Sequence, residues 1–259
     1  EFEQRIRGLS YLEIAERGGG ILSTVEATRK ASFDELFSLG KKRLDRMFSK
    51  GVTTLEAKSG YGLSLQDEVK ILQVMKALQE NHPIEIVPTF LGAHTIPREF
   101  RDARPRYIDV VIEEMIPRIA QERLAEFCDV FCEEKAFTVE ESRRILETGK
   151  RYGLKPKIHA DQFSPGGGAE LAAEVNAYSA DHLEFVSQEG IKKMAEKGVI
   201  AVLLPGASFF LSMKKYPPAR EMVEQGVSVS LATDLNPGSS MTESLPMMMT
   251  MGCTMYKLL

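Results

Sequence analysis

Four side chains that could bind a metal or move a proton stand where apolar runs of the sequence end. His94 closes the run VPTFLGAH, His159 closes KPKIHA, and His182 closes YSADH. Asp234 closes VSVSLATD in the same way. Imidazole and carboxylate together suit zinc or another divalent transition metal. Because such an ion lowers the pKa of a bound water toward neutrality, these residues indicate metal-assisted hydrolysis.

Other polar residues at the ends of apolar runs are weaker candidates. Lys58 ends TTLEAK, and Glu133 and Glu134 end DVFCEE. The fourth histidine, His82, lies in an Asn-His-Pro turn, where we expect a solvated surface side chain. A single histidine in an apolar strand is usually a core residue. The hypothesis of a site therefore depends on three such histidines and Asp234 lying in one layer.

Two glycine-rich stretches, GGGI (18–21) and SPGGGAE (164–170), could hold a phosphate at a helix N-terminus. Neither has a nucleotide-binding pattern, so we expect tight turns. The loop DLNPGSS (234–240) is a better candidate for substrate contact. It follows Asp234 directly and offers amide, backbone N–H and hydroxyl groups to a small polar molecule.

The elements that must position these residues alternate along the chain. Four times a helical pattern ends in a glycine that leads into an apolar run, at Gly51, Gly153, Gly198 and Gly226. Capping-box spacing marks two helix starts, Ser32 to Glu35 and Thr138 to Glu141. With three further runs, at 84–94, 127–134 and 177–183, seven buried strands are predicted, each followed by helical sequence.

This alternation predicts an α/β fold with a parallel sheet. A (β/α)8 barrel needs eight strands to close, whereas an open doubly wound sheet could use seven. We favour the barrel because its catalytic residues come from the carboxyl ends of several strands, where the polar residues of this chain fall. Histidine and aspartate ligands would then face one bowl.

Composition restricts the class of protein. The 259 residues carry a formal net charge of −4 with no block of like charges, which disfavours nucleic-acid and membrane partners. No apolar run could span a membrane, and no signal peptide is visible, so we expect a cytoplasmic protein. We expect the three cysteines to be buried, reduced thiols. The methionines at 241, 247, 248, 249 and 251 are expected in the core.

Six segments together resemble the imidazolonepropionase family of the amidohydrolase superfamily. They are AKSGYGL (57–63), FLGAHT (90–95), KIHADQF (157–163), SADHLE (179–184), LLPGASFFL (203–211) and ATDLNPGSS (232–240). The opening segment 1–29 is similar to the same family. The histidine and aspartate positions are shared with many amidohydrolases, whereas SGYG and DLNPGSS narrow the choice.

The resemblance implies hydrolysis of 4-imidazolone-5-propanoate to N-formimidoyl-L-glutamate in histidine degradation. It implies a metal-dependent amidohydrolase barrel over 1–259, with one Zn or Fe ion held by His159 and Asp234. His182 matches the histidine that orients or deprotonates the attacking water, and Gln162 lies where members carry Glu or Gln near the scissile amide. Since Gln162 cannot be a general base, proton transfer is expected at Asp234 and His182. The implied substrate contacts are Tyr61, His94, Gln162, Asn236, Gly238 and Ser239.

One departure from the family pattern is large. The His-x-His motif that supplies two metal ligands from the first strand is absent from the sequence, as is the arginine that follows it. We therefore expect a single barrel domain that is incomplete at both ends, with seven of eight strands, weak metal binding and little activity of its own. Another amidohydrolase activity or a noncatalytic barrel remains open as an alternative. A homodimer is also compatible with the resemblance.

Overall fold

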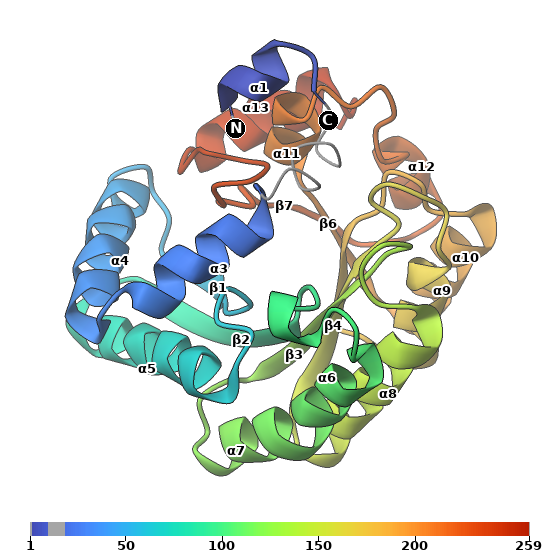
Figure 1. Cartoon of the computed structure of the whole chain (residues 1–259). Helices are drawn as coiled ribbons and strands as arrows, with labels where there is room; N and C mark the ends of the chain where they lie inside the picture. The colour runs from blue at the N-terminus through green and yellow to red at the C-terminus, as the bar shows by residue number, and fades with distance from the viewer. Residues whose placement is uncertain (1, 10–18, 259) are drawn as a thin grey trace.

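The strands form one curved parallel sheet whose order follows the chain. The computed structural model describes residues 2–9 and 19–258, and within them seven strands pair in the order β1-β2-β3-β4-β5-β6-β7. The strands are β1 (Thr54–Lys58), β2 (Glu85–Ala93), β3 (Phe127–Cys132), β4 (Lys155–Ala160), β5 (Ser179–His182), β6 (Ile200–Leu203) and β7 (Val229–Leu231). The sheet curls into a partial barrel with helices around its outside (Figure 1). The predicted α/β barrel with seven of its eight strands is confirmed.

Parallel pairing with a helix after each strand places the carboxyl ends of all strands on one side. Each neighbouring pair is parallel, for example His159 of β4 opposite Asp181 of β5. Among the described residues, β1 pairs only with β2 and β7 only with β6. Within the described residues, the two outer strands therefore each keep an unpaired edge.

Helices connect successive strands and precede the first one. Before β1 lie α1 (Phe2–Ile6), α3 (Ile21–Lys30) and α4 (Phe33–Phe48). The connections contain α5 (Leu65–Asn81), η1 (Arg98–Phe100), α6 (Arg104–Val110), η2 (Val111–Met115), α7 (Ile116–Gln121), α8 (Val139–Arg151), α9 (Gly168–Glu174), α10 (Gln188–Lys197), α11 (Pro205–Phe210) and α12 (Ala219–Glu224). After β7 comes α13 (Leu245–Thr254). No helix in the described ranges has both the length and the apolar character needed to cross a bilayer.

Local signals in the sequence set the helix boundaries. Ser32 and Thr138 both form the predicted reciprocal capping boxes with the glutamates three residues later. The glycines at 51, 153, 198 and 226 all have positive φ, from 68° to 90°, which is the left-handed conformation expected after a helix. These signals are confirmed.

The structure corrects the predicted burial of His82 and of one cysteine. His82 is not a solvated side chain: it is 3% exposed, packs edge-on against Phe48 and accepts the Ile84 N–H at Nδ1. Cys128 and Cys132 are buried free thiols as expected, but Cys253 is exposed. Burial raises the pKa of the Cys132 thiol to about 11, so it stays protonated.

The methionine cluster is divided between the core and the surface. Met248 and Met251 are buried, whereas Met241, Met247 and Met249 are about half exposed, at 53%, 47% and 59%. The helix α13 presents only one side to the sheet, where Gly252 lies against Leu231. A run of methionines around the whole helix therefore cannot be buried in this chain.

Candidate active site

The three strand-end histidines lie together at the carboxyl end of the sheet. The ring centres of His94 and His159 are 6.3 Å apart, and those of His159 and His182 are 5.5 Å apart. His94 follows β2, His159 lies in β4 and His182 ends β5. Asp234 follows β7 and is close enough to His159 for the two groups to interact electrostatically. The structure thus gathers the four residues singled out in the sequence.

Two of these side chains stand on unusual backbone. His182 has φ 79° and Asp234 has φ 49°, both in the left-handed region that residues other than glycine rarely adopt. Such strain is retained where the surrounding structure fixes the residue, commonly at functional sites. His182 is the last residue of β5, and Asp234 lies three residues beyond the end of β7, so both stand where the chain leaves the sheet.

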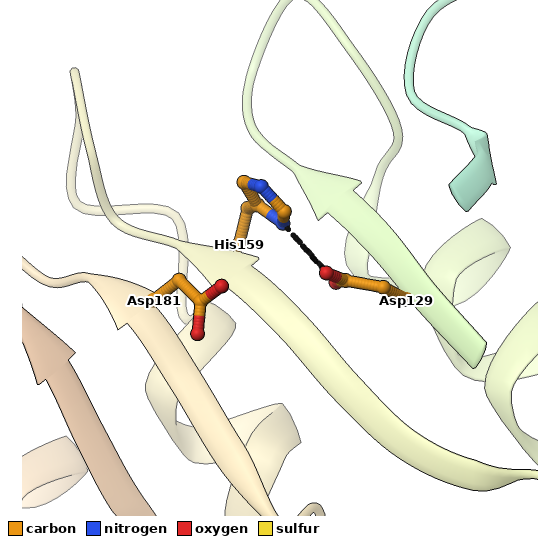
Figure 2. A group of neighbouring side chains, drawn as sticks. All are labelled: Asp129, His159 and Asp181. Carbon is orange, nitrogen blue, oxygen red and sulfur yellow. Dashed lines mark hydrogen bonds and ion pairs between the residues drawn. The ribbon is translucent and has the colours of Figure 1, made fainter. Parts of the chain in front are cut away.

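The orientation of His159 is set by a buried carboxylate. Its Nδ1 lies 3.1 Å from Asp129 Oδ1, and Asp129 is fully buried in β3 (Figure 2). Since a carboxylate can only accept, His159 donates from Nδ1 and keeps Nε2 for another partner. Carboxylate–histidine pairs of this kind fix the tautomer of metal-binding histidines.

Lys58 balances the negative charge around Asp129. Its Nζ lies 2.7 Å from Asp129 Oδ2, 3.0 Å from Asp181 Oδ2 and 2.9 Å from Glu56 Oε1. Burial would lower the pKa of the Lys58 ammonium, but Asp129, Asp181 and Glu56 together raise it well above its usual value. Burial would likewise raise the pKa of Asp129, yet His159 and Lys58 hold it well below its usual range.

Asp129, His159 and Asp181 offer ligand atoms within 4.8 Å of one another, a spacing that could hold a metal ion (Figure 2). Lys58 already pairs with both carboxylates, so an ammonium takes the place of a cation between them. The Asp129 contact leaves the second ring nitrogen of His159, Nε2, directed away from that carboxylate. Asp129 in this cluster therefore fixes the orientation of His159. The three side chains also present ligand atoms at a spacing that suits a metal ion.

Two further groups of the bowl, His182 and Asp234, have chemistry that suits a bound cation or its water. His182 Nδ1 is buried without a hydrogen-bond partner among the described residues. Burial raises the pKa of the Asp234 carboxyl to about 6, and Ser239 Oγ is its hydrogen-bond donor at 3.3 Å. A desolvated carboxylate and an orphan imidazole nitrogen are groups that a bound metal or its water would satisfy.

Burial also keeps two imidazoles neutral. It lowers the pKa of His94 to about 4 and that of His182 to about 3, with His159 adding a repulsive contribution to each. For His159 burial acts in the same direction, but Asp129 outweighs it and raises the pKa. Neutral imidazoles can act as ligands or accept protons.

Residues predicted to contact substrate surround this bowl. The Tyr61 ring packs edge-on against His94 with centres 5.2 Å apart. The Asn236 amide donates to Asp234 O and Ser239 Oγ, both at 2.7 Å, and accepts from the N–H groups of Gly238 and Ser239. These four bonds use the full capacity of the amide. Asn236 therefore shapes the 234–240 loop, and substrate contact would require one of these bonds to be exchanged.

Gln162 lies between two anchored neighbours. The Asp161 carboxylate accepts the N–H groups of Gly166, Gly168 and Ala169, and Glu133 accepts the N–H of Phe163. Gln162 itself is 5% exposed. Asp161 therefore occupies three N–H donors of the 164–170 stretch, which bends after Gln162 and leads into the start of α9.

Three buried acids of the site were not identified from the sequence. Asp129 and Asp181 lie inside apolar strands, and Glu184 follows β5 as a fully buried carboxyl group. The signal was available, because a lone acid in the middle of a buried strand such as FCDVFC needs a partner. Lys58, which is that partner, was noted only as a strand-end residue.

Similarity to known proteins agrees with this geometry, although no protein-family model matches the chain. An imidazolonepropionase from Brevibacillus brevis is 58% identical over 253 residues, which cover 98% of this chain and 59% of the relative. One from Alkaliphilus oremlandii is 53% identical over 258 residues, covering 100% of this chain and 61% of the relative. Over nearly its whole length, the chain is similar to these imidazolonepropionases. It spans about three-fifths of the length of these relatives.

Solved structures share the fold of this chain at low sequence identity. A guanine deaminase from C. acetobutylicum with bound guanine has a TM-score of 0.65 at 13% identity, covering 88% of this chain and 56% of the other. An amidohydrolase from Burkholderia ambifaria with bound Zn has a TM-score of 0.65 at 16% identity, covering 88% and 64%. These two structures therefore share the fold of the partial barrel.

Proposed function

We propose that the protein containing this chain is an imidazolonepropionase, which hydrolyses the cyclic amide of 4-imidazolone-5-propanoate to N-formimidoyl-L-glutamate. The observation that carries the proposal is the gathering of His94, His159, His182 and Asp234 at one end of the sheet. It occurs in a chain that is 58% identical to a curated imidazolonepropionase. The substrate is a small molecule, and the pathway is histidine degradation.

His159 and Asp234 are the proposed ligands of one metal ion, Zn or Fe. When bound, such an ion lowers the pKa of a water molecule and polarises the amide carbonyl. His159 suits this role because Asp129 holds its Nδ1, so that Nε2 is available. The chain offers no His-x-His pair, so two ligands are what its own residues supply.

The remaining residues orient water and move protons. His182, whose Nδ1 has no partner among the described residues, is placed to fix the attacking water, and Asp234 takes the proton of that water. Water oxygen adds to the ring carbonyl carbon, and the bond from that carbon to the ring nitrogen breaks. Asp234 carries the proton to the departing nitrogen, which balances the hydrolysis. Gln162 is proposed to donate a hydrogen bond to the ring.

Substrate recognition is assigned to the rim of the bowl. The ring centres of Tyr61 and His94 are 5.2 Å apart. The 234–240 loop begins with Asp234, which accepts a hydrogen bond from Ser239 of the same loop. We propose that these groups, with Asn236, Gly238 and Ser239, contact the imidazolone ring and its propanoate. The 1–259 segment is proposed to be a single barrel domain, a homodimer is compatible with this family, and a cytoplasmic location fits its chemistry.

A substrate panel tests the activity. The chain is joined to the additional segments of the Brevibacillus brevis relative and assayed with 4-imidazolone-5-propanoate, other cyclic amides and aminated heterocycles. The proposal predicts ring opening of the imidazolone and no ammonia release from the aminated compounds. Preferred turnover of another cyclic amide, or ammonia release, would assign a different amidohydrolase activity. No turnover of any compound would favour a noncatalytic barrel.

A further inference from the structure

A buried carboxylate holds the loop that carries Tyr61. Glu68 of α5 is 0% exposed and reaches back past the start of its helix. Its carboxylate accepts the N–H groups of Gly60, Gly62 and Leu63 at 2.8–3.1 Å. Three backbone donors converge on one side chain, which defines the path of the 60–63 loop.

The same loop sets the position of His94. The Gly60 carbonyl lies 3.0 Å from His94 Nδ1, and because a carbonyl can only accept, Nδ1 carries the proton. Gly60 has φ +97°, and a Cβ there would lie 2.7 Å from Leu91 O and 3.1 Å from His94 Nδ1. Glycine is therefore required for the close approach of this loop to the imidazole. A continuous path of hydrogen bonds runs from Glu68 through Gly60 to His94.

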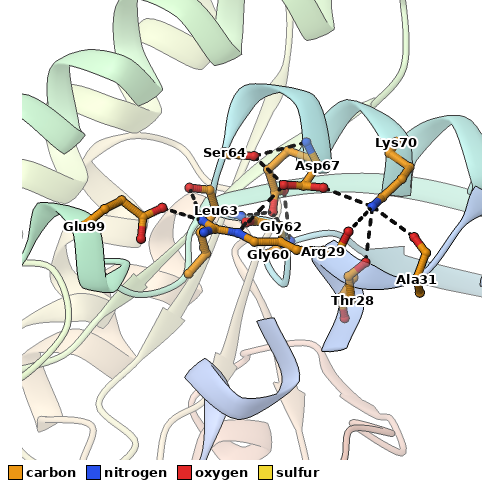
Figure 3. Close-up of polar contacts among 11 residues, drawn as sticks. Thr28, Arg29, Ala31, Gly60, Gly62, Leu63, Ser64, Asp67, Lys70 and Glu99 are labelled. Carbon is orange, nitrogen blue, oxygen red and sulfur yellow. Dashed lines mark hydrogen bonds and ion pairs between the residues drawn. The ribbon is translucent and has the colours of Figure 1, made fainter. Parts of the chain in front are cut away.

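Arg29 holds the opposite side of the loop. Its guanidinium donates to the carbonyls of Gly62 and Leu63 at 2.6 and 3.2 Å and pairs with Glu99 at 2.7 Å (Figure 3). Lys70 donates to the carbonyls of Thr28, Arg29 and Ala31 at the end of α3 (Figure 3). The N–H and C=O groups of the loop are therefore fixed from α5 on one side and from α3 on the other.

Helix capping does not account for Glu68. The N-cap residue Ser64 already accepts the Asp67 N–H, and Asp67 accepts from the Ser64 hydroxyl. A negative charge interacts favourably with the helix dipole when it lies in the first turn, and it can do so while exposed to solvent. Burial of a carboxylate is costly, and here its N–H partners belong mainly to the loop.

We propose that Glu68 is a positioning residue that sets the orientation of His94 and the place of Tyr61. Its importance for substrate rests on the proposed function, in which both residues contact the imidazolone. The positioning itself is a property of the ligand-free chain. It can therefore be measured whether or not the chain hydrolyses anything.

The test uses nitrogen-15 NMR of the 259-residue chain without ligand, comparing Glu68→Gln with the parent. In the parent, His94 is expected as the Nδ1–H tautomer, and the amides of Gly60, Gly62 and Leu63 are expected to exchange slowly. In Glu68→Gln, an amide nitrogen replaces one acceptor oxygen. We expect those three amides to exchange at least about tenfold faster, and His94 to become a mixture of tautomers.

Glu80→Gln is the matched control, because it removes the same charge from an exposed position of the same helix. It should leave both readouts unchanged. An unchanged His94 tautomer and unchanged loop amides in Glu68→Gln would overturn the proposal. If Glu68→Gln does not fold, the parent decides: fast exchange at the three amides, or an Nε2–H tautomer of His94, would also overturn it.

Discussion

Asp129 decides which nitrogen of His159 faces the bowl. Asp129→Asn keeps an acceptor for Nδ1–H but removes the charge that strengthens this bond. Changes to such partners of metal-binding histidines typically cost 10- to 100-fold in metal affinity, so we expect zinc to bind about tenfold more weakly. Competition with a coloured chelator measures this in the 259-residue chain.

The exposed Asp102 gives the control for that measurement. Asp102→Asn should bind zinc as the parent does, because it removes the same charge at an exposed position. Equal zinc affinity of Asp129→Asn and the parent would show that Asp129 serves only to pair with Lys58.

Glu184 makes stability depend on pH near neutrality. Its carboxyl group accepts from Ser208 Oγ at 2.8 Å, its other oxygen has no partner among the described residues, and burial raises its pKa from 4.5 to about 7. The folded chain therefore binds a proton that the unfolded chain releases above about pH 4.5. The contribution of Glu184 to the free energy of unfolding is fully present below that pH, and it is lost as the pH rises through about 7.

We expect Glu184→Gln to flatten the pH dependence of the unfolding free energy. A shift of this size corresponds to at most about 3 kcal/mol between pH 5 and pH 8. Urea unfolding at both pH values measures the difference, with the exposed Glu196→Gln as the control. A parent and a Glu184→Gln variant with the same pH dependence would contradict the assignment.

At the scale of the residue, the sequence was enough to predict that certain groups at strand ends lie near one another. His94, His159, His182 and Asp234 could be found because parallel strands deliver their carboxyl ends to one place. Asp129 and Glu68 were missed because their roles depend on which partner lies across the sheet or loop. Sequence spacing does not contain that information.

At the scale of the element, Asp161 organises the connection from β4 to α9. Its carboxylate accepts three backbone N–H groups, from Gly166, Gly168 and Ala169, at 2.9–3.2 Å. Asp161→Asn places an amide N–H toward those donors. We expect a loss of about 1–3 kcal/mol in the free energy of unfolding.

Chemical denaturation measures this loss, and Asp102→Asn again serves as a neutral substitution. A midpoint for Asp161→Asn that equals the parent would show that the 164–170 turn holds itself. We also expect the amides of residues 164–170 to exchange faster in Asp161→Asn, with amides elsewhere unchanged.

The order of strands and helices could be predicted because each local signal depends only on residues close to it in the sequence. Capping boxes at Ser32 and Thr138 and glycines after helices need only their immediate neighbours. Burial was less predictable. His82 is buried because Phe48 and Asp45 of a different helix lie against it, and Met247 is exposed because α13 has one covered side.

At the scale of the whole molecule, the partial barrel has two edges that no strand of residues 2–9 or 19–258 pairs with. Among the described residues, β1 and β7 each have one neighbouring strand. Unpaired edges favour association between copies, and a lysine on an edge discourages it. We expect the 259-residue chain to associate as its concentration rises. We expect Ser230→Lys, at the exposed central residue of β7, to reduce this association.

Sedimentation velocity over a range of concentrations measures the association. Ser38→Lys adds the same charge to an exposed position of α4 and should change it far less. Equal association of the parent and both variants would indicate contact through another surface, such as the exposed methionines of α13.

The most direct test of the account measures metal content and turnover together in the chain joined to the additional segments of its relative. The account predicts that His159→Ala loses the metal and the hydrolysis of 4-imidazolone-5-propanoate. It predicts that His182→Ala keeps most of the metal and loses turnover. Loss of metal in His182→Ala equal to that in His159→Ala would contradict the assigned roles.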